Sequence, residues 1–301
     1  MNKTPGIDDL RLYCTVVRHR SFAATARELG VSKAVVSKRM AILEAAVHAK
    51  LLHRTTRTVS LTGQGEIVYQ WALRILEDVE QMSDALLQEK AAPRGRLRIC
   101  SSSGFGRNRL APALSELARC YPELEIHLEL LDRAVDLIEE GFQIDIRVGQ
   151  VREGHVIKRR IASNRRILCA APAYLARFGP PTCLDDLKRH RCIAIRERDQ
   201  EFWRWEFSGP EGGSAVKVSG PLSANNGEVV RQWAIEGLGI ILRSEWDVEK
   251  AIKKGELVHL LPDYSQEADV WAVFPSSLSV SAKTKICVEF LTEWFARARN
   301  P

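Results

Sequence analysis

A long helical segment in the first third of the chain restricts most strongly what this sequence can fold into. Between residues 63 and 90, apolar residues recur at alternating steps of four and three, the spacing of a coiled-coil seam. At 1.5 Å per residue such a helix is about 42 Å long, and it ends at Ala91-Ala92-Pro93. The chain of 301 residues therefore divides into a small N-terminal module, a rod and a large C-terminal part. The seam consists of Val68, Ala72, Ile75, Val79, Met82 and Leu86.

This seam packs either on its own domain or on a second chain. Its position between a very small module and a Pro/Gly break favours self-association.

The module, residues 1–62, has the pattern of three short helices. Ser21 is a good cap for the second helix, which Gly30 ends, and Ser32 caps a third helix over 33–46. A helix, a turn that contains glycine and a second helix form the unit that places its second helix in the major groove of DNA. The side chains expected inside the last two helices are Phe22, Ala26, Leu29, either Val35 or Val36, Met40 and Leu43.

The positive charge of the chain is concentrated in this module. The formal net charge is +6, but residues 1–62 alone contain 11 Lys or Arg and 4 Asp or Glu. Residues 53–61 combine β-branched side chains with cations, which suits a small two-stranded wing whose edge meets phosphate. A basic module indicates a polyanion as its partner, although a merely solvated surface has the same surplus.

Composition and motifs exclude several classes of protein. Hydrophobic residues make up 45% and charged residues 27%, as in a folded soluble chain, and no stretch has the roughly 18 apolar residues of a membrane span. The first residues contain no apolar signal core, and seven scattered cysteines favour a reducing compartment, so we expect a cytoplasmic protein. Because zinc-ligand spacings, phosphate loops and nucleophile motifs are absent from the sequence, we expect no enzyme, no metal and no cofactor.

Beyond the rod, short strands alternate with helices. This alternation predicts an α/β domain built largely on parallel strands, either as one domain or as two lobes. The strands are expected at 97–100, 124–130, 144–148, 166–171, 192–195, 222–224, 240–242 and 270–274, with helices that include 110–120, 135–140 and 282–298.

The module resembles a known family. The stretch SFAATARELGVSKAVVSKRMAILE, residues 21–44, is similar to the winged helix-turn-helix of LysR-type transcriptional regulators. The match extends through Arg54-Thr55 to Leu61-Thr62 and Gly65. The family usually has Gly where this chain has His48, at a helix end where glycine accepts positive φ cheaply.

The resemblance implies an α+β multidomain protein. A winged helix-turn-helix over 1–62 and a linker and dimerisation helix over 63–92 precede a two-lobed α/β effector domain, similar to periplasmic binding proteins, over 93–301. Its first lobe comprises 93–165 and 267–301, and its second lobe 166–266.

Three segments of the effector domain look most like regulators of hydroxy-dicarboxylic acid use, such as malate or tartrate. They are Ile144-Asp145-Ile146-Arg147, Val229-Val230-Arg231 and Val270-Trp271-Ala272-Val273. The resemblance therefore implies a DNA-binding transcriptional regulator controlled by a small anionic organic effector between the lobes. The implied partners are double-stranded promoter DNA, a small organic acid, further copies of the chain in a homodimer and a homotetramer, and RNA polymerase, without a membrane.

The resemblance places the DNA contacts at the start of the third helix and in the wing. Lys33 is the foremost candidate for a base contact, because lysine donates to guanine O6 or N7, whereas the family usually has Gln there. A lone cation is usually an idle surface charge, but five of them on this pattern favour DNA. The predicted DNA-binding residues are Ser32, Lys33, Ala34, Ser37, Lys38, Arg39, Arg54 and Arg57.

The loop Ser101-Ser102-Ser103-Gly104 follows a strand and precedes a helix, where hydroxyl and N–H groups either hold a carboxylate or cap the helix. The family resemblance makes the cleft between the lobes the effector site. Asn226 caps the following helix equally well, and Arg243 either neutralises an acidic ligand or lies on the surface. The predicted effector-binding residues are Ser101, Ser102, Arg147 and Asn226.

Two other functions stay open. Peroxide-sensing members of the family use two cysteines in this lobe, and Cys183 with Cys192 offers such a pair, although a free cysteine in an apolar strand usually packs as a small hydrophobe. The other is an enzyme or a solute-binding protein whose N-terminal module serves only for oligomerisation. The missing catalytic motif and export signal count against that class.

Overall fold

The computed structural model describes residues 4–54, 59–86, 93–151, 156–196, 203–275 and 281–297. The chain divides into two compact units, the first reaching to residue 91 and the second containing nearly all of the remainder. Across the described residues, no helix is both long enough and apolar enough to cross a lipid bilayer.

The first unit begins with the predicted helix-turn-helix. Ser21 Oγ accepts a hydrogen bond from the N–H of Ala24 at 3.2 Å, and Ser32 Oγ accepts one from the N–H of Val35 at 3.3 Å, so both predicted caps are present. Gly30 connects the second and third helices with φ of +65°, which a residue without Cβ adopts easily. The helices are α1 (Ile7–His19), α2 (Phe22–Glu28) and α3 (Lys33–Ala46).

The inner face of α3 carries large apolar side chains into the core. Val36 and Met40 are fully buried, whereas Val35 is 41% exposed, so Val36 is the valine that points inward. Leu29 was expected inside, and that prediction is wrong, because α2 ends at Glu28 and leaves Leu29 at the C-cap, 37% exposed.

The helix end at which the family usually has glycine does have an unusual backbone. His48 has φ of +53°, and the N–H of Ala49 donates to the carbonyl of Glu44 at 3.1 Å to close the turn. Left-handed backbone is unfavourable for a residue with a Cβ. The substitution of a usual glycine by His48 is therefore tolerated at some cost to the turn.

A two-stranded wing follows α3 and leads into the long helix. Thr62 joins the two elements, because its Oγ1 donates to the carbonyl of Lys50 at 2.6 Å and accepts from the N–H of Gly65 at 2.8 Å. The hydroxyl of Tyr13 in α1 donates to the carbonyl of Gly65 at 2.7 Å. The elements are β1 (Leu52–Arg54), the antiparallel β2 (Val59–Leu61) and α4 (Gly63–Leu86).

The apolar seam of α4 is divided between two surfaces. Val68 and Ala72 pack into the core of the first unit, so the expectation that the whole seam faces a second chain is wrong for them. Their burial follows from the packing of α4 against α1. Other apolar side chains of α4 recur at helical spacing outside this core and form an exposed stripe. They are Ile67, Trp71, Ile75 and Met82.

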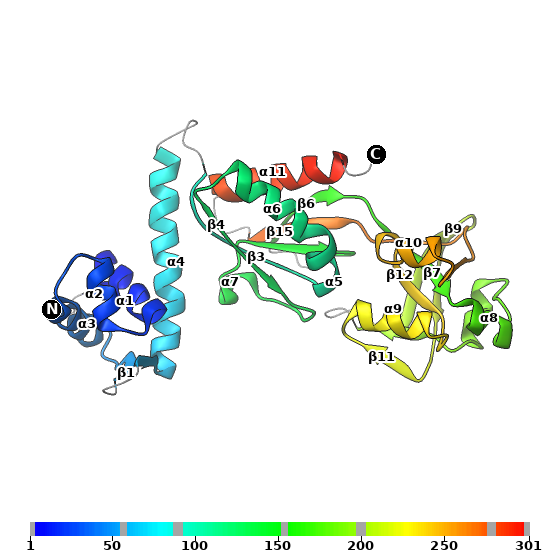
Figure 1. The fold of residues 1–301 in the computed structure, drawn as a ribbon, viewed down its shortest axis with the longest axis horizontal. Coiled ribbons are helices and arrows are strands. Elements are labelled where there is room, and N and C mark those ends of the chain that lie inside the picture. The colour runs from blue at the N-terminus through cyan, green and yellow to red at the C-terminus, as the bar shows by residue number, and fades with distance from the viewer. Residues whose placement is uncertain are drawn as a thin grey trace. The chain divides into compact units, whose positions relative to one another are not determined.

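The first lobe of the second unit is built on a mixed sheet with the strand order β4-β3-β5-β15-β6. Strands β4 and β5 are parallel to β3, whereas β15 is antiparallel to β5 and β6. Helices α6 and α11 cover one face of this sheet (Figure 1). The bounds are β3 (Gly95–Ser101), α5 (Ser103–Phe105), α6 (Ala111–Cys120), β4 (Leu124–Leu130), α7 (Leu137–Glu140), β5 (Ile144–Val148), β6 (Val156–Ala162), β15 (Val270–Pro275) and α11 (Ala282–Arg297).

The second lobe contains several smaller sheets. Strand β7 pairs antiparallel with β12, β13 and β14, while β8 is parallel to β11 and β9 forms a hairpin with β10. The bounds are β7 (Arg165–Ala170), α8 (Pro172–Phe178), β8 (Ile193–Ile195), β9 (Arg204–Gly209), β10 (Gly212–Lys217), β11 (Leu222–Ala224), α9 (Gly227–Ile235), β12 (Ile241–Ser244), α10 (Glu245–Lys253), β13 (Val258–Leu260) and β14 (Gln266–Glu267).

The expectation of a largely parallel domain is wrong. Most of the described pairings are antiparallel, and the parallel ones join β3 to its two neighbours and β8 to β11, with one isolated parallel bridge between Cys192 and Ile240. The reason is the return of the chain from the second lobe, because β15 enters the first sheet in the opposite direction. Strand β6 was not predicted, since its middle residues are exposed and show little apolar alternation.

The two lobes are connected where β6 leads into β7 and where β14 leads back into β15. The N–H of Asn164 donates to Oδ1 of Asp269 at 3.0 Å, and its Nδ2 donates to the carbonyl of Ala268 at 2.8 Å. Arg160 Nη1 donates to the other oxygen of Asp269 at 3.1 Å. These bonds tie the two connections together at one place, which we call the pivot.

Candidate functional site

The first turn of α3 presents the predicted base-contacting side chains to solvent. Lys33, Ala34 and Lys38 are exposed, and Ser37 is half-buried one turn into the helix. Ser32 lies at the cap position with its hydroxyl bonded to the backbone, as expected. In a helix-turn-helix, this end of the second helix is the one that reaches base edges.

The other predicted cations differ in what surrounds them. Arg39 Nε donates to Oδ1 of Asp9 at 2.7 Å, so this guanidinium also fastens α3 to α1. Arg54 is described only as part of β1, and Arg57 lies outside the described residues.

A buried carboxylate fixes the wing relative to α3. Glu44 is 4% exposed and accepts from the N–H of Leu51 at 3.0 Å and from Nζ of Lys50 at 2.8 Å. Since Leu51 directly precedes β1, this contact sets where the wing begins.

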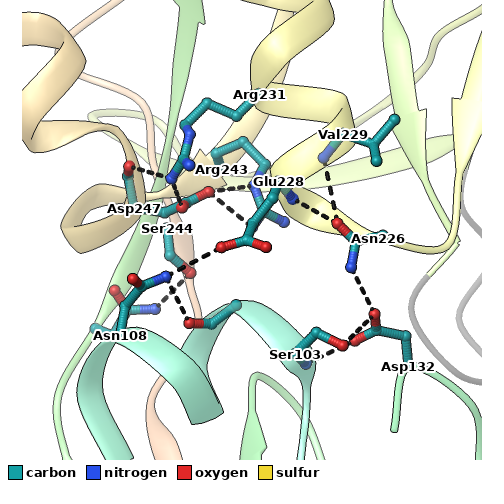
Figure 2. A network of polar contacts seen from close by, with 12 residues as sticks. Ser103, Asn108, Asp132, Asn226, Glu228, Val229, Arg231, Arg243, Ser244 and Asp247 are labelled. Atoms are coloured by element: carbon teal, nitrogen blue, oxygen red, sulfur yellow. Dashed lines mark hydrogen bonds and ion pairs between the residues drawn. The ribbon is translucent and has the colours of Figure 1, made fainter. Parts of the chain in front are cut away.

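In the second unit, a polar cluster joins the two lobes (Figure 2). Asp132, just after β4, accepts from both the N–H and the Oγ of Ser103 at 2.8 Å. Its Oδ2 also accepts from Nδ2 of Asn226, in the second lobe, at 2.8 Å. The Oδ1 of Asn226 accepts from the N–H groups of Glu228 and Val229 at 3.0 and 3.2 Å. Asn226 therefore combines the two roles that the sequence left as alternatives, since it caps α9 and faces the first lobe.

A second carboxylate also bridges the lobes, but it belongs to the second lobe and accepts from donors of the first. Glu228 of α9 accepts from Nη1 of Arg107 at 2.8 Å and from Nδ2 of Asn108 at 3.2 Å. Figure 2 shows Asn108 and Glu228 turned toward each other beside the start of α9. Each lobe thus contributes one carboxylate that holds donors of the other lobe.

The structure brings only part of the predicted effector set to this cluster. Ser101 is fully buried, and its Oγ donates to the carbonyl of Ile146 at 3.1 Å inside the sheet. Arg147 is 8% exposed, and its Nε donates to Asp145 at 2.7 Å. Ser102 is half-buried at the cap position of α5, without a capping bond from its side chain.

Sequence reasoning missed the residues that make the bridges. Asp132 follows a strand that is parallel to β3, and the carboxyl ends of neighbouring parallel strands meet at one edge of a sheet. That rule could have placed it beside the serine loop. The missed residues are Arg107, Asn108, Asp132 and Glu228, while Ser103 was named in the serine loop but left out of the predicted set.

Arg243 belongs to a buried ion cluster. It is 4% exposed, and its Nε and Nη2 donate to Oδ2 of Asp247 at 2.9 and 2.8 Å. Arg231 also pairs with this carboxylate and donates to the Asp247 carbonyl at 3.1 Å. Gly227 leaves room for the Arg243 guanidinium, which a Cβ at that position would meet. Of the two alternatives for Arg243, the surface position is therefore wrong, and the charge that would neutralise an acidic ligand is already balanced by Asp247.

A cavity of about 680 Å³ opens elsewhere in the second unit, near the connections between the lobes. Its lining includes the aromatic side chains of Phe105, Trp246 and Phe295. Arg165, which also lines it, makes a bidentate pair with Glu245, at 2.9 Å for both bonds. Arg109 and Glu249 are the other charged residues of the lining, so two cations are matched by two anions. The lining therefore has no surplus of positive charge to attract an acid.

Cys192, one member of the cysteine pair, is poorly placed for peroxide sensing. Cys192 is fully buried, and burial raises the pKa of its thiol to about 12. A thiol with that pKa is protonated near neutral pH and reacts slowly. Cys183 is exposed and also free. In the described part of the chain, no group of three or more His, Cys, Asp or Glu is arranged to hold a metal ion.

Comparison with known proteins decides the family. The sequence profile of "Bacterial regulatory helix-turn-helix protein, lysR family" matches residues 7–66, and that of "LysR substrate binding domain" matches residues 90–296. The chain belongs to the LysR family. It is thus a LysR-type DNA-binding transcriptional regulator, with a winged helix-turn-helix and a two-lobed effector-binding domain.

Individual LysR relatives cover almost the whole chain. The HTH-type transcriptional regulator DmlR of Escherichia coli (strain K12) is 51% identical over 296 residues, which are 98% of this chain and 96% of DmlR. The HTH-type transcriptional activator TtdR of the same strain is 44% identical over 294 residues, 98% of this chain and 95% of TtdR. The structure of CrgA, a LysR-type regulator from Neisseria meningitidis, gives a TM-score of 0.59 at 28% identity and covers 97% of this chain and 99% of CrgA. These relatives are regulators, so the prediction that the chain is not an enzyme is confirmed, as is the subgroup indicated by the sequence.

Proposed function

We propose that this protein controls transcription by binding promoter DNA through the first turn of α3, in response to a hydroxy-dicarboxylic acid held between its two lobes. The observation that carries the DNA part is the exposure of Lys33 on a capped helix of a winged helix-turn-helix. The acid is supported by the similarity to DmlR and TtdR and by the N–H and O–H donors that converge between the lobes.

The same proposal covers organisation and partners. Residues 1–62 bind DNA, 63–92 pair two copies, and 93–301 bind the effector, with 93–165 and 267–301 as the first lobe and 166–266 as the second. The exposed stripe of α4 forms the seam of a homodimer, and dimers associate into a tetramer that acts in the cytoplasm and contacts RNA polymerase. An apolar stripe at helical spacing on a long helix supports the pairing.

In this mechanism the acid changes the angle between the lobes and, through the linker helix, the placement of the paired DNA-binding modules. An effector can shift this equilibrium only if it binds the two arrangements with different affinity. The pivot formed around Asp269 supports such a rotation, because it ties both connections at one place.

The DNA part is tested by comparing Lys33→Ala with Lys38→Ala. Loss of a base contact at Lys33 should cost about 1–3 kcal/mol of discrimination between the operator and a scrambled duplex. Loss of a phosphate contact at Lys38 should weaken binding to both duplexes equally and lower the salt slope by about 1. Mobility shifts on the gene's own upstream DNA at several salt concentrations measure both effects.

The control for lost charge is Lys254→Ala, because Lys254 is 69% exposed and belongs to the second unit, outside the residues of the helix-turn-helix. If Lys33→Ala weakens binding to the operator and the scrambled duplex by the same factor, the assignment of Lys33 to a base is wrong.

The effector part is tested by thermal unfolding with malate, tartrate and the neutral polyol erythritol. A ligand that binds only the folded state stabilises it by about 2.7 kcal/mol at a concentration of 100 Kd. We expect both acids to raise the Tm and erythritol to leave it unchanged. Equal effects of all three would contradict the acid proposal.

A further inference from the structure

We propose that Asp132 and Glu228 stand in for the two carboxylates of the effector. They occupy donors where the two lobes meet and hold the lobes together, and a dicarboxylate must displace both. This inference rests on the proposed effector function, whose ligand class it explains.

The contacts of Asp132 are those that a bound acid needs. An ionised carboxylate has only acceptors, so it binds best where several donors converge. Around Asp132 these donors are the N–H and hydroxyl of Ser103 in the first lobe and the amide Nδ2 of Asn226 in the second, all at 2.8 Å. A ligand carboxylate cannot take these donors while Asp132 holds them.

Glu228 repeats this arrangement from the other side. It belongs to the second lobe, and its donors, Arg107 and Asn108, belong to the first. The two bridges adjoin, because Oδ1 of Asn226 accepts the backbone N–H of Glu228 while its Nδ2 donates to Asp132. Two internal carboxylates therefore lie on either side of Asn226, at the start of α9 (Figure 2).

Repulsion between like charges explains why a bound dicarboxylate would displace Asp132 and Glu228. A dianion that entered while Asp132 and Glu228 kept their places would face two like charges at close range, which is unfavourable. If they swing away, each donor exchanges one carboxylate for another and none is left without an acceptor. A monocarboxylate can replace only one bridge, so the arrangement selects for acids with two carboxylates.

The measured affinity is then the intrinsic affinity reduced by the fraction of molecules whose donors are uncovered. Removing an internal competitor should tighten binding. We expect Asp132→Ala and Glu228→Ala each to lower the Kd for malate about tenfold in calorimetric titrations of the full chain. Asp132→Asn removes the charge but keeps an acceptor for Ser103, and it replaces the alanine variant if that variant does not fold.

The matched control is Asp185→Ala. Asp185 is an exposed acid of the second lobe whose pair with Lys188 stays within that lobe. It reports what the loss of one negative charge does to malate binding without any change to the bridges, and we expect an unchanged Kd.

A second readout needs no ligand. Cys120 in the first lobe and Cys183 in the second are exposed natural thiols for spin labels. Cys14 is half-buried, and burial raises its pKa to about 12, which slows its labelling. We expect the distance between the two labels to lengthen or broaden in the double variant D132A/E228A, and to stay unchanged in D185A.

The outcomes separate the two proposals. An unchanged or raised Kd for malate in the variants overturns the inference, because the carboxylates would then be simple caps or part of the ligand's own site. If the wild type binds neither malate nor tartrate while the double variant shows the longer distance, the effector proposal fails and the bridges stand. If the acids bind and the distance between the two labels does not change in D132A/E228A, the inference about the bridging carboxylates is wrong and the effector proposal stands.

Discussion

Replacement of Gly65 by alanine is expected to destabilise the first unit by about 3 kcal/mol or more and to abolish DNA binding. A Cβ at this position would lie 2.9 Å from the carbonyl carbon of Leu51 and would overlap its oxygen. Both are backbone atoms, so no rotation of a side chain relieves the clash. The N–H and carbonyl of Gly65 also bond to Thr62 and Tyr13, which prevents the helix from moving away without further loss.

The matched control is Gly63→Ala, two residues earlier in α4, where a Cβ meets nothing within 4 Å. We expect this variant to be neutral or more stable by up to about 1 kcal/mol, since alanine is the better helix former. Amide exchange of buried positions in α1 and α3 follows the unfolding of this unit alone, and mobility shifts report DNA binding. Similar losses in both variants would show that glycine flexibility, and not space at Leu51, matters here.

The second large effect is expected for Asp247→Ala, which should destabilise the second unit by about 3–5 kcal/mol. Asp247 balances Arg243, which is buried, and Arg231, which is largely buried. Without this carboxylate, the buried Arg243 guanidinium loses the bidentate contact that balances its charge, which costs more than the pair itself contributes. Urea unfolding of the full chain, followed by the fluorescence of its tryptophans, measures the change.

Two controls isolate the buried charge as the cause. Glu249→Ala removes an exposed ion pair with Lys253 from the same helix and should change stability by less than about 1 kcal/mol. In a background of Arg243→Met, removal of Asp247 should cost clearly less, because the buried cation that this carboxylate balances is gone. Additive losses in that double variant would contradict the role assigned to the pair.

Elements defined by local signals were predictable from the sequence. Helix α3 has the predicted bounds, because Ser32 supplies a cap and Gly30 the preceding turn, and both signals lie within a few residues. The strands over 124–130 and 144–148 were also predicted with their observed bounds. The direction of strand pairing was not, since it depends on how the chain returns through β15 from a distant lobe.

The same distinction applies to the candidate site. Asn226 carries a local signal as a helix cap, whereas its partner Asp132 is 94 residues away and is invisible to any local pattern. The burial of Ser101 was predictable, because Leu97, Ile99 and Ser101 share one face of a strand whose apolar members are fully buried. Strand alternation, applied to β3, would have placed this serine inside the lobe.

The packing of α4 has a practical consequence for dissecting the protein. Val68 and Ala72 complete the hydrophobic core of the first unit, so a fragment that ends at residue 62 would lack part of that core. A second copy of the chain that binds the exposed stripe of α4 will also stabilise the folded first unit by mass action. The Tm of the first unit should therefore rise with protein concentration. The shortest N-terminal fragment that keeps the core of this unit complete ends beyond residue 72.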